Sequence, residues 1–175
     1  MKKDKENSEY SAKDKMETIK IMLADDDKDD QDLFKEALDH TSVHTELTTA
    51  NNGKELMDNL HDPEIPNPDI IFLDINMPIK NGKECLKEIK EDAELKDIPT
   101  VIYTTSNSEK DINDTYNTGA NLFVPKPYSF SIIIVVLKNI FTLRWKQLFT
   151  KPEKKDFVMS EKTAKGNSQI TNTQF

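Results

Sequence analysis

Side chains that can do chemistry recur at one kind of position in this sequence, directly after a short apolar run. They are Asp25 and Asp26, Asp74, Thr104 and Thr105, and Lys126. Three carboxylates that converge repel one another and require a cation, and an all-oxygen ligand set suits a hard ion such as Mg²⁺. No histidine follows these runs, so zinc fits poorly. A carboxylate nucleophile beside Mg²⁺, a hydroxyl and an ammonium group is suited to phosphoryl transfer.

These side chains can converge only if the apolar runs form one parallel sheet. Short apolar runs alternate with segments that carry a helical stripe of apolar residues. The expected strands are residues 19–24, 43–49, 70–73, 100–103 and 121–124, and the expected helices begin near residues 28, 53, 82, 109 and 129. This alternation predicts an α/β fold, a doubly wound five-stranded parallel sheet with five helices on its two faces. Ligands of such sheets bind beyond the carboxyl ends of the strands, where the candidate side chains fall.

The order, spacing and strand context of these motifs resemble the receiver domain of two-component response regulators. The resemblance covers about residues 18–143 and rests on Asp25-Asp26, Leu73-Asp74-Ile75-Asn76-Met77-Pro78, Asn81-Gly82, Thr104 and Val124-Pro125-Lys126-Pro127. It implies a flavodoxin-like sheet with the strand order 2-1-3-4-5.

The resemblance also implies a phosphoacceptor and a metal site. Asp74 would accept the phosphoryl group. Mg²⁺ would be bound by Asp26, Asp74 and the backbone carbonyl of Asn76, with Asp25 acting mainly through water.

Further roles follow from the same resemblance. Thr104 would hydrogen-bond the phosphoryl group, and Lys126 would pair with it. Phe123 occupies the place of the family's aromatic switch residue; it lacks a hydroxyl, so only its packing could report the state. The Lys126–Pro127 bond is expected to be cis, and Gly82 is expected where the backbone approaches the active-site loop closely.

Composition excludes several classes of protein. The 175 residues carry a formal net charge of −8, and Arg144 is the only arginine, which argues against direct nucleic-acid binding. Cys85 is the only cysteine, so no internal disulfide is expected. We see no leader-like segment, and the longest apolar run, residues 132–137, is far shorter than the ~20 residues that span a bilayer. We therefore expect a cytoplasmic protein with no membrane contact.

The charge is unevenly distributed along the chain. Residues 1–17 are neutral overall, residues 151–175 carry +2, and residues 18–150 carry −10. Both ends are polar and poor in large apolar residues. We therefore expect flexible tails at residues 1–17 and 151–175 around a receiver domain at residues 18–150.

An apolar stripe extends the last expected helix beyond the usual end of a receiver domain. It consists of Ile134, Leu137, Phe141, Trp145 and Leu148. Either the extension folds back on its own domain, or it completes a homodimer surface with the fourth helix and the fifth strand. Stand-alone receivers of the phytochrome-associated kind have similar extensions, and an exposed aromatic stripe would be costly, so we favour the homodimer.

The acidic run after the first strand has a competing interpretation as an EF-hand loop. Asp25, Asp27, Asp29 and Glu36 fall at the ligand positions, but Asp30 stands where the loop requires glycine. We expect Asp27, Asp29 and Asp30 to be solvated acids at a helix N-terminus.

Two other classes remain as alternatives. A phosphatase of the haloacid-dehalogenase type also uses an aspartyl phosphate, but it usually needs an aspartate where this chain has Asn76. A flavodoxin-like binder of FMN needs a hydroxyl- and glycine-rich phosphate loop, whereas Asp25 and Asp26 would repel a phosphate.

The sequence therefore predicts a single-domain response regulator that is not an enzyme. Only 25 residues, most of them polar, follow Thr150, and we expect these to be too few for an output domain. A histidine kinase or phosphotransfer protein would supply the phosphoryl group, and a downstream protein target would receive the signal by contact.

Overall fold

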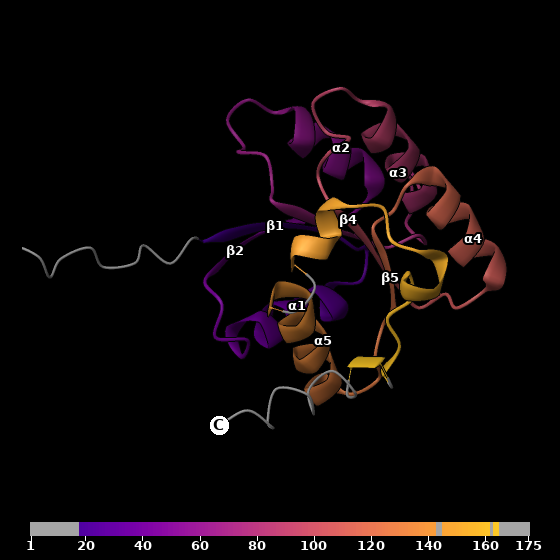
Figure 1. The fold of residues 1–175 in the computed structure, drawn as a ribbon. Helices are drawn as coiled ribbons and strands as arrows, with labels where there is room; N and C mark the ends of the chain where they lie inside the picture. The colour runs from indigo at the N-terminus through magenta and orange to yellow at the C-terminus, as the bar shows by residue number, and fades with distance from the viewer. Residues whose placement is uncertain (1–17, 143–144, 162, 165–175) are drawn as a thin grey trace, which may run out of the picture.

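Five parallel strands form the centre of the molecule in the order β2-β1-β3-β4-β5. The computed structural model describes residues 18–142, 145–161 and 163–164 (Figure 1). The elements are β1 Ile19–Ala24, α1 Lys28–Asp39, β2 Thr45–Ala50, α2 Gly53–His61, β3 Ile70–Leu73, α3 Gly82–Glu91, β4 Thr100–Thr104, α4 Glu109–Thr118, β5 Leu122–Pro125 and α5 Phe130–Thr142, followed by the 3₁₀ turns η1 Trp145–Phe149 and η2 Lys154–Asp156. The predicted fold class and strand order are confirmed, and β2 begins two residues later than expected.

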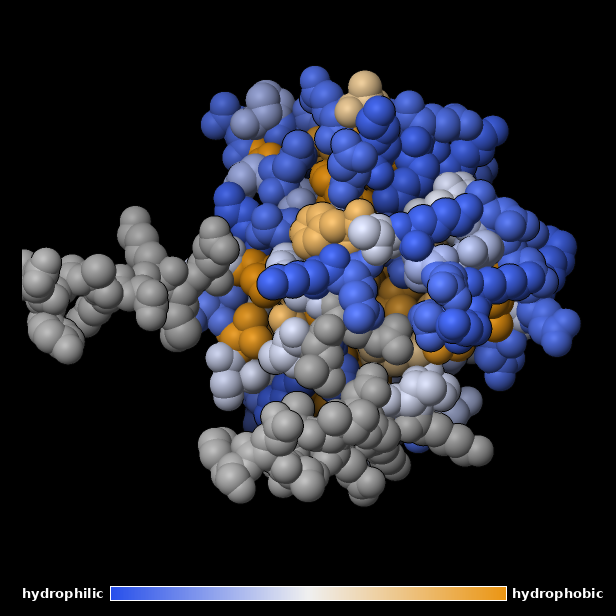
Figure 2. All heavy atoms as spheres, in the orientation of Figure 1, coloured by the Kyte–Doolittle hydropathy of each residue, from blue (hydrophilic) through white to orange (hydrophobic). Residues whose placement is uncertain are grey.

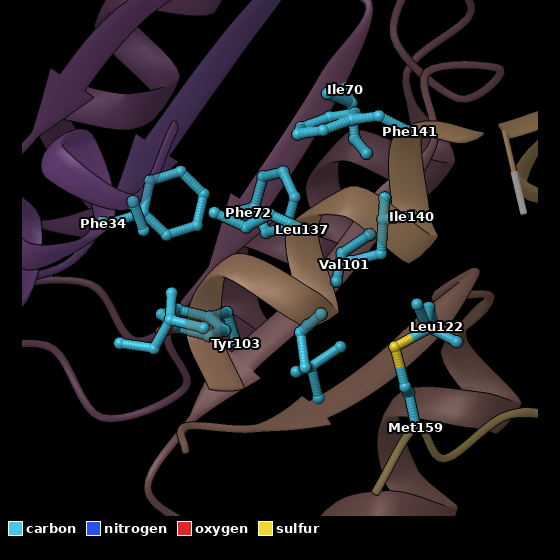
Figure 3. Packing of buried hydrophobic residues seen from close by; sticks show 14 of the residues in the cluster. Phe34, Ile70, Phe72, Val101, Tyr103, Leu122, Leu137, Ile140, Phe141 and Met159 are labelled. Atoms are coloured by element: carbon cyan, nitrogen blue, oxygen red, sulfur yellow. The ribbon is translucent and has the colours of Figure 1, made fainter. Parts of the chain in front are cut away.

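Each face of the sheet has its own apolar layer because successive side chains of a strand point to opposite faces. Ile70 and Phe72 of β3 lie in the layer beneath α1 and α5, which Figure 3 shows around Phe34 and Leu137. Their neighbours Ile71 and Leu73 lie in the layer that contains buried residues of α2 and α3. All four residues of β3 are fully buried, as expected for a central parallel strand.

Side-chain caps fix the starts of the first four helices. Asp27 accepts two backbone N–H bonds at α1, and Asn52 and Ser108 cap α2 and α4. Asn81 and Glu84 form a reciprocal capping box at α3. As a result, α1 begins shortly after Asp25 and Asp26, and α4 begins five residues after Thr104.

The extension after α5 differs from the expected continuous helix. α5 ends at Thr142, and η1 follows as a 3₁₀ turn in which Leu148 is buried. Trp145 packs against Phe141, with 6.2 Å between the ring centroids. Trp145 and Leu148 are three residues apart, a spacing that fits one turn of either helix type, so the last step of the apolar stripe could not distinguish them. In this respect the extension folds back on its own domain, although Phe149 is 56% exposed.

The segment from residue 151 was expected to be a flexible tail, but its first part packs against the domain. Phe157 and Met159 are buried, and Val158 forms a parallel bridge with Phe123 of β5. These few apolar residues lie in a charged segment, so the average composition of the segment did not indicate that they would be buried. The expected N-terminal tail at residues 1–17 lies outside the described residues.

The surface over α2, α3 and α4 is mostly hydrophilic on the face seen in Figure 2. None of the helices in the described part of the chain combines the length and the apolar character needed to cross a bilayer.

Candidate functional site

The strand ends place three carboxylates at one rim of the sheet. The backbone N–H of Asp25 donates to Ala50 O of β2, and that of Asp74 donates to Ala24 O of β1, so the pairing continues one residue past each strand. Carboxylate oxygens of Asp25, Asp26 and Asp74 lie within 4.8 Å of one another. Asp25 and Asp74 are buried, whereas Asp26 is exposed to solvent. The cluster therefore consists of two buried carboxylates and one that solvent can reach.

Asp74 is held at both of its oxygens. Thr104, fully buried at the end of β4, donates its hydroxyl to Asp74 Oδ1 at 2.7 Å. The backbone N–H of Asn76 donates to the same oxygen at 3.1 Å. Lys126 Nζ lies 3.0 Å from Asp74 Oδ2. The carboxylate is thereby oriented by a hydroxyl, an amide and an ammonium group.

Lys126 is shared among several acids. Its Nζ lies 2.7 Å from Asp25 Oδ2 and 2.7 Å from Asp30 Oδ2, and its side chain is only 8% exposed. Burial alone would lower the pKa of Lys126, but the close pairing with Asp25 and Asp30 and the charge of Asp74 outweigh burial and raise it. Lys126 therefore stays charged across the physiological range.

One carboxylate oxygen of Asp25 is suited to binding a cation. Burial raises the pKa of Asp25 to about 6, although the neighbouring ammonium of Lys126 acts in the opposite direction. Despite that ion pair, Asp25 Oδ2 receives no well-directed hydrogen bond from any residue in the described part of the chain. A buried carboxylate oxygen in this condition, beside two more carboxylates, fits an oxygen-binding cation such as Mg²⁺.

The loop after β3 depends on Gly82 at the start of α3. A Cβ at this position would collide with the backbone carbonyl of Asp74. The predicted close approach is confirmed, and it fixes the position of the segment that carries Asn76.

Two expectations for individual residues need correction. The Lys126–Pro127 peptide is trans rather than cis; trans is the preferred form even before proline, by about 0.5–1 kcal/mol. Asp30, expected to be solvated, pairs with Lys126 because the first turn of α1 faces the rim.

Phe123 and Gln31 complete the surroundings of the site. Phe123 is fully buried in the layer beneath α2 and α3. Gln31, which the sequence analysis missed, is buried and donates its amide to Asp25 O at 2.6 Å and to Asn51 Oδ1 at 3.1 Å. The only signal for Asp30 and Gln31 was their position in the first helical turn after the rim.

Comparisons with known proteins agree with this geometry. A family model described as the response regulator receiver domain matches residues 21–138. Response regulator Rcp1 of Synechocystis sp. is 32% identical over 136 residues, which span 75% of this chain and 92% of Rcp1.

Two solved structures resemble the whole domain. The Mn²⁺-bound form of response regulator Rcp1 has a TM-score of 0.66 at 32% identity, covering 77% of this chain and 99% of that one. The phosphorylated cyanobacterial phytochrome response regulator RcpA has a TM-score of 0.69 at 36% identity, covering 78% of this chain and 100% of that one. This chain belongs to the response regulator receiver domain family of two-component signalling.

Proposed function

We propose that this chain is a single-domain response regulator that accepts a phosphoryl group on Asp74. The observation that carries the proposal is the environment of Asp74, a buried carboxylate with Thr104 and Lys126 on its two oxygens and two further carboxylates beside it. The family match and the phosphorylated relative RcpA support the same assignment.

In the proposed reaction, Asp74 is the nucleophile. A carboxylate oxygen of Asp74 forms a bond to phosphorus while the bond from phosphorus to the imidazole nitrogen of a phosphohistidine donor breaks. The electron pair of the broken bond stays on that nitrogen. The ammonium of Lys126 and the hydroxyl of Thr104 stabilise the negative charge of the phosphoryl oxygens.

Divalent cation binding is assigned to the residues that fit it. Asp25, Asp26 and Asp74 would hold Mg²⁺ together with the backbone carbonyl of Asn76, and the donor set is all oxygen. Mg²⁺ would neutralise phosphoryl charge at the rim. A Mn²⁺-bound form of the relative Rcp1 supports a divalent site.

Phosphorylation is proposed to signal by a population shift between two packings. Thr104 would follow the phosphoryl group and Phe123 would pack inward behind it. In this structure the Thr104 hydroxyl already faces Asp74 and Phe123 is already buried, which is the arrangement expected of the inward state.

Receiver domains interact with histidine kinases or phosphotransfer proteins, and one of these is the proposed donor here. The signal would then pass to a downstream protein by contact in the cytoplasm, with no nucleic acid or membrane involved. A homodimer through α4, β5 and the extension of α5 stays a prediction. However, Trp145 and Leu148, on which it rested, pack within this chain.

The alternative class is an enzyme, a phosphatase that turns over an aspartyl phosphate. Asn76 stands two residues after Asp74, where such phosphatases usually carry an aspartate acid–base group, and the nucleophile follows β3 rather than β1. We therefore propose a signalling domain with slow self-dephosphorylation only. Steady turnover of a phosphomonoester such as p-nitrophenyl phosphate would favour the enzyme.

The proposed function is tested with acetyl phosphate and Mg²⁺, followed by intact mass spectrometry. The wild type is expected to gain one phosphoryl group and the Asp74→Asn variant none. Asp69→Asn is the matched control, because Asp69 lies outside the rim and its carboxylate accepts the Lys20 N–H instead. No gain in the wild type, or an equal gain in Asp74→Asn, would refute the assignment.

A further inference from the structure

Residues 151–160, called the strap from here on, lie along the outer edge of β5. Figure 1 shows this yellow segment passing α4 and running beside β5. Phe123 of β5 donates its N–H to Phe157 O at 2.8 Å and accepts the N–H of Met159 at 2.8 Å. The strap thereby pairs with both backbone groups of Phe123 at a sheet edge, where such groups otherwise remain unpaired.

The strap contributes a side chain to each of the two apolar layers. Residues two apart in a regular strand would share one face, but the backbone of Phe157 is helical rather than extended. Phe157 is fully buried in the layer beneath α2 and α3, and Met159 is 1% exposed in the layer beneath α1 and α5. Figure 3 shows Met159 beside Leu122. Burial of one aromatic and one methionine side chain stabilises the docked strap.

Contacts from α4 and from Asn121, just before β5, anchor the segment at its beginning. Tyr116 of α4 donates its hydroxyl to Pro152 O at 3.2 Å, and Lys151 Nζ lies 5.0 Å from the centroid of the Tyr116 ring. Just before the strap, Leu148 O accepts the side-chain amide of Asn121 at 2.6 Å. Together with the backbone bond from Met159 to Phe123, these contacts fix the strap both before and after Phe157.

The strap contacts the residue proposed as the switch. The Phe157 ring packs against Phe123 and Tyr116, with centroid distances of 6.1 and 5.1 Å. Phe157 thus covers Phe123 at the β5 edge, and an outward movement of Phe123 would have to displace Phe157.

Phe123 is also linked to the acidic rim through the sheet. Phe123 belongs to the apolar layer that contains Leu73 and Ile75, the residues on either side of Asp74. It also lies three residues before Lys126, whose N–H bonds Thr104 O at 2.8 Å. These links connect the packing of Phe123 with the geometry around Asp74.

We propose that the strap is a regulatory element of the phosphorylation site, which favours the inward packing of Phe123 and is thermodynamically coupled to a phosphoryl group on Asp74. The coupling rests on the proposed function. Because linkage is reciprocal, a docked strap strengthens binding of a phosphoryl mimic at Asp74, and the mimic in turn tightens the strap by the same factor.

The coupling is tested from both directions with beryllofluoride and Mg²⁺ as the probe. Amide hydrogen exchange of the full chain, followed by NMR, is expected to slow at Phe123 and Met159 by at least about 5-fold when the probe is bound, the lower end of typical couplings. In Phe157→Ala the affinity for the probe is expected to fall by a similar factor. Phe149→Ala is the matched control, since Phe149 is exposed and packs on Trp145; its affinity is expected to equal that of the wild type.

The outcomes separate this proposal from the proposed function. If the wild type binds the probe while exchange at Met159 is unchanged and Phe157→Ala binds equally well, the coupling is refuted and the phosphoacceptor assignment stands. If the wild type binds no probe, both are refuted. Phe157→Leu, which keeps an apolar side chain in the layer, serves for the same comparison if Phe157→Ala is unfolded by circular dichroism.

Discussion

One ammonium group organises the acidic rim at the residue scale. Lys126 lies within 3.0 Å of carboxylate oxygens from Asp25, Asp30 and Asp74, and Asp26 adds a further carboxylate nearby. Four carboxylates against one lysine leave the rim with net negative charge near neutral pH. The rim therefore attracts a divalent cation and, without one, resists the approach of a negatively charged phosphoryl donor.

The hydrogen bond from Thr104 to Asp74 predicts a defined stability cost. Thr104→Val keeps the shape of the side chain but removes the donor to a buried carboxylate. Hydrogen bonds to charged groups contribute about 1.5–3 kcal/mol, so the free energy of unfolding in urea is expected to fall by about that amount. Thr105→Val is the control, because Thr105 is exposed and should change stability by less than about 0.5 kcal/mol. Equal effects of the two substitutions would contradict the geometry.

The sequence predicted those side chains of the rim that directly follow an apolar run. Asp25, Asp74 and Thr104 meet because parallel strands end at a common edge, and this is local information. Asp30 and Gln31 reach the rim only through the direction in which α1 leaves β1, which depends on the packed structure. An acid in a first helical turn is also explained by the helix dipole alone, so its pairing with Lys126 was missed.

At the scale of the elements, Lys90 links three segments of the chain. It lies in α3, and its Nζ donates to Ile98 O at 2.8 Å and to Asn121 Oδ1 at 3.3 Å. It thereby links the end of α3 to the segments that enter β4 and β5. Burial lowers the pKa of Lys90 to about 8, and the charge of Asp97, which acts in the opposite direction, does not outweigh burial.

The lowered pKa of Lys90 predicts a pH dependence of stability. Between about pH 8 and the ordinary lysine value of 10.5, the unfolded chain binds a proton that the folded chain has released. Stability from this group therefore rises with pH across that window and is lowest below it. Urea unfolding at a series of pH values should show the stability of the wild type rising relative to that of Lys90→Met across this window. Lys87→Met, which alters an exposed lysine of the same helix, should keep the rise; three parallel curves would contradict the role of burial.

Helices and strands could be predicted from the sequence where the apolar pattern and the capping residues indicated the same boundaries. The five strands and the first four helices carry apolar runs or stripes bounded by capping residues. The end of α5 and the strap were not predictable in the same way. A spacing of three residues fits both helix types, and Phe157 and Met159 are too few to raise the apolar content of a charged segment. Their positions depend on the β5 edge, which exists only in the folded molecule.

Cation binding should stabilise the whole molecule, because the three carboxylates converge only after folding. Adding Mg²⁺ is therefore expected to raise the thermal midpoint relative to chelator at equal ionic strength. A stabilisation of 1 kcal/mol corresponds to roughly 2–8 °C for domains of this size range. Differential scanning fluorimetry should show the shift in the wild type and in Asp69→Asn, but much less in Asp26→Asn, where an exposed rim carboxylate is lost. Equal shifts in all three proteins would place the cation elsewhere.

Phosphorylation of Asp74 is the central claim, and the position of the acyl phosphate tests it most directly. After treatment with acetyl phosphate and Mg²⁺, borohydride reduces an aspartyl phosphate to homoserine, which tandem mass spectrometry locates in the sequence. We predict homoserine at position 74, in the peptide that also carries Asn76. Homoserine at another aspartate, or none in a protein that remains folded, would contradict the account.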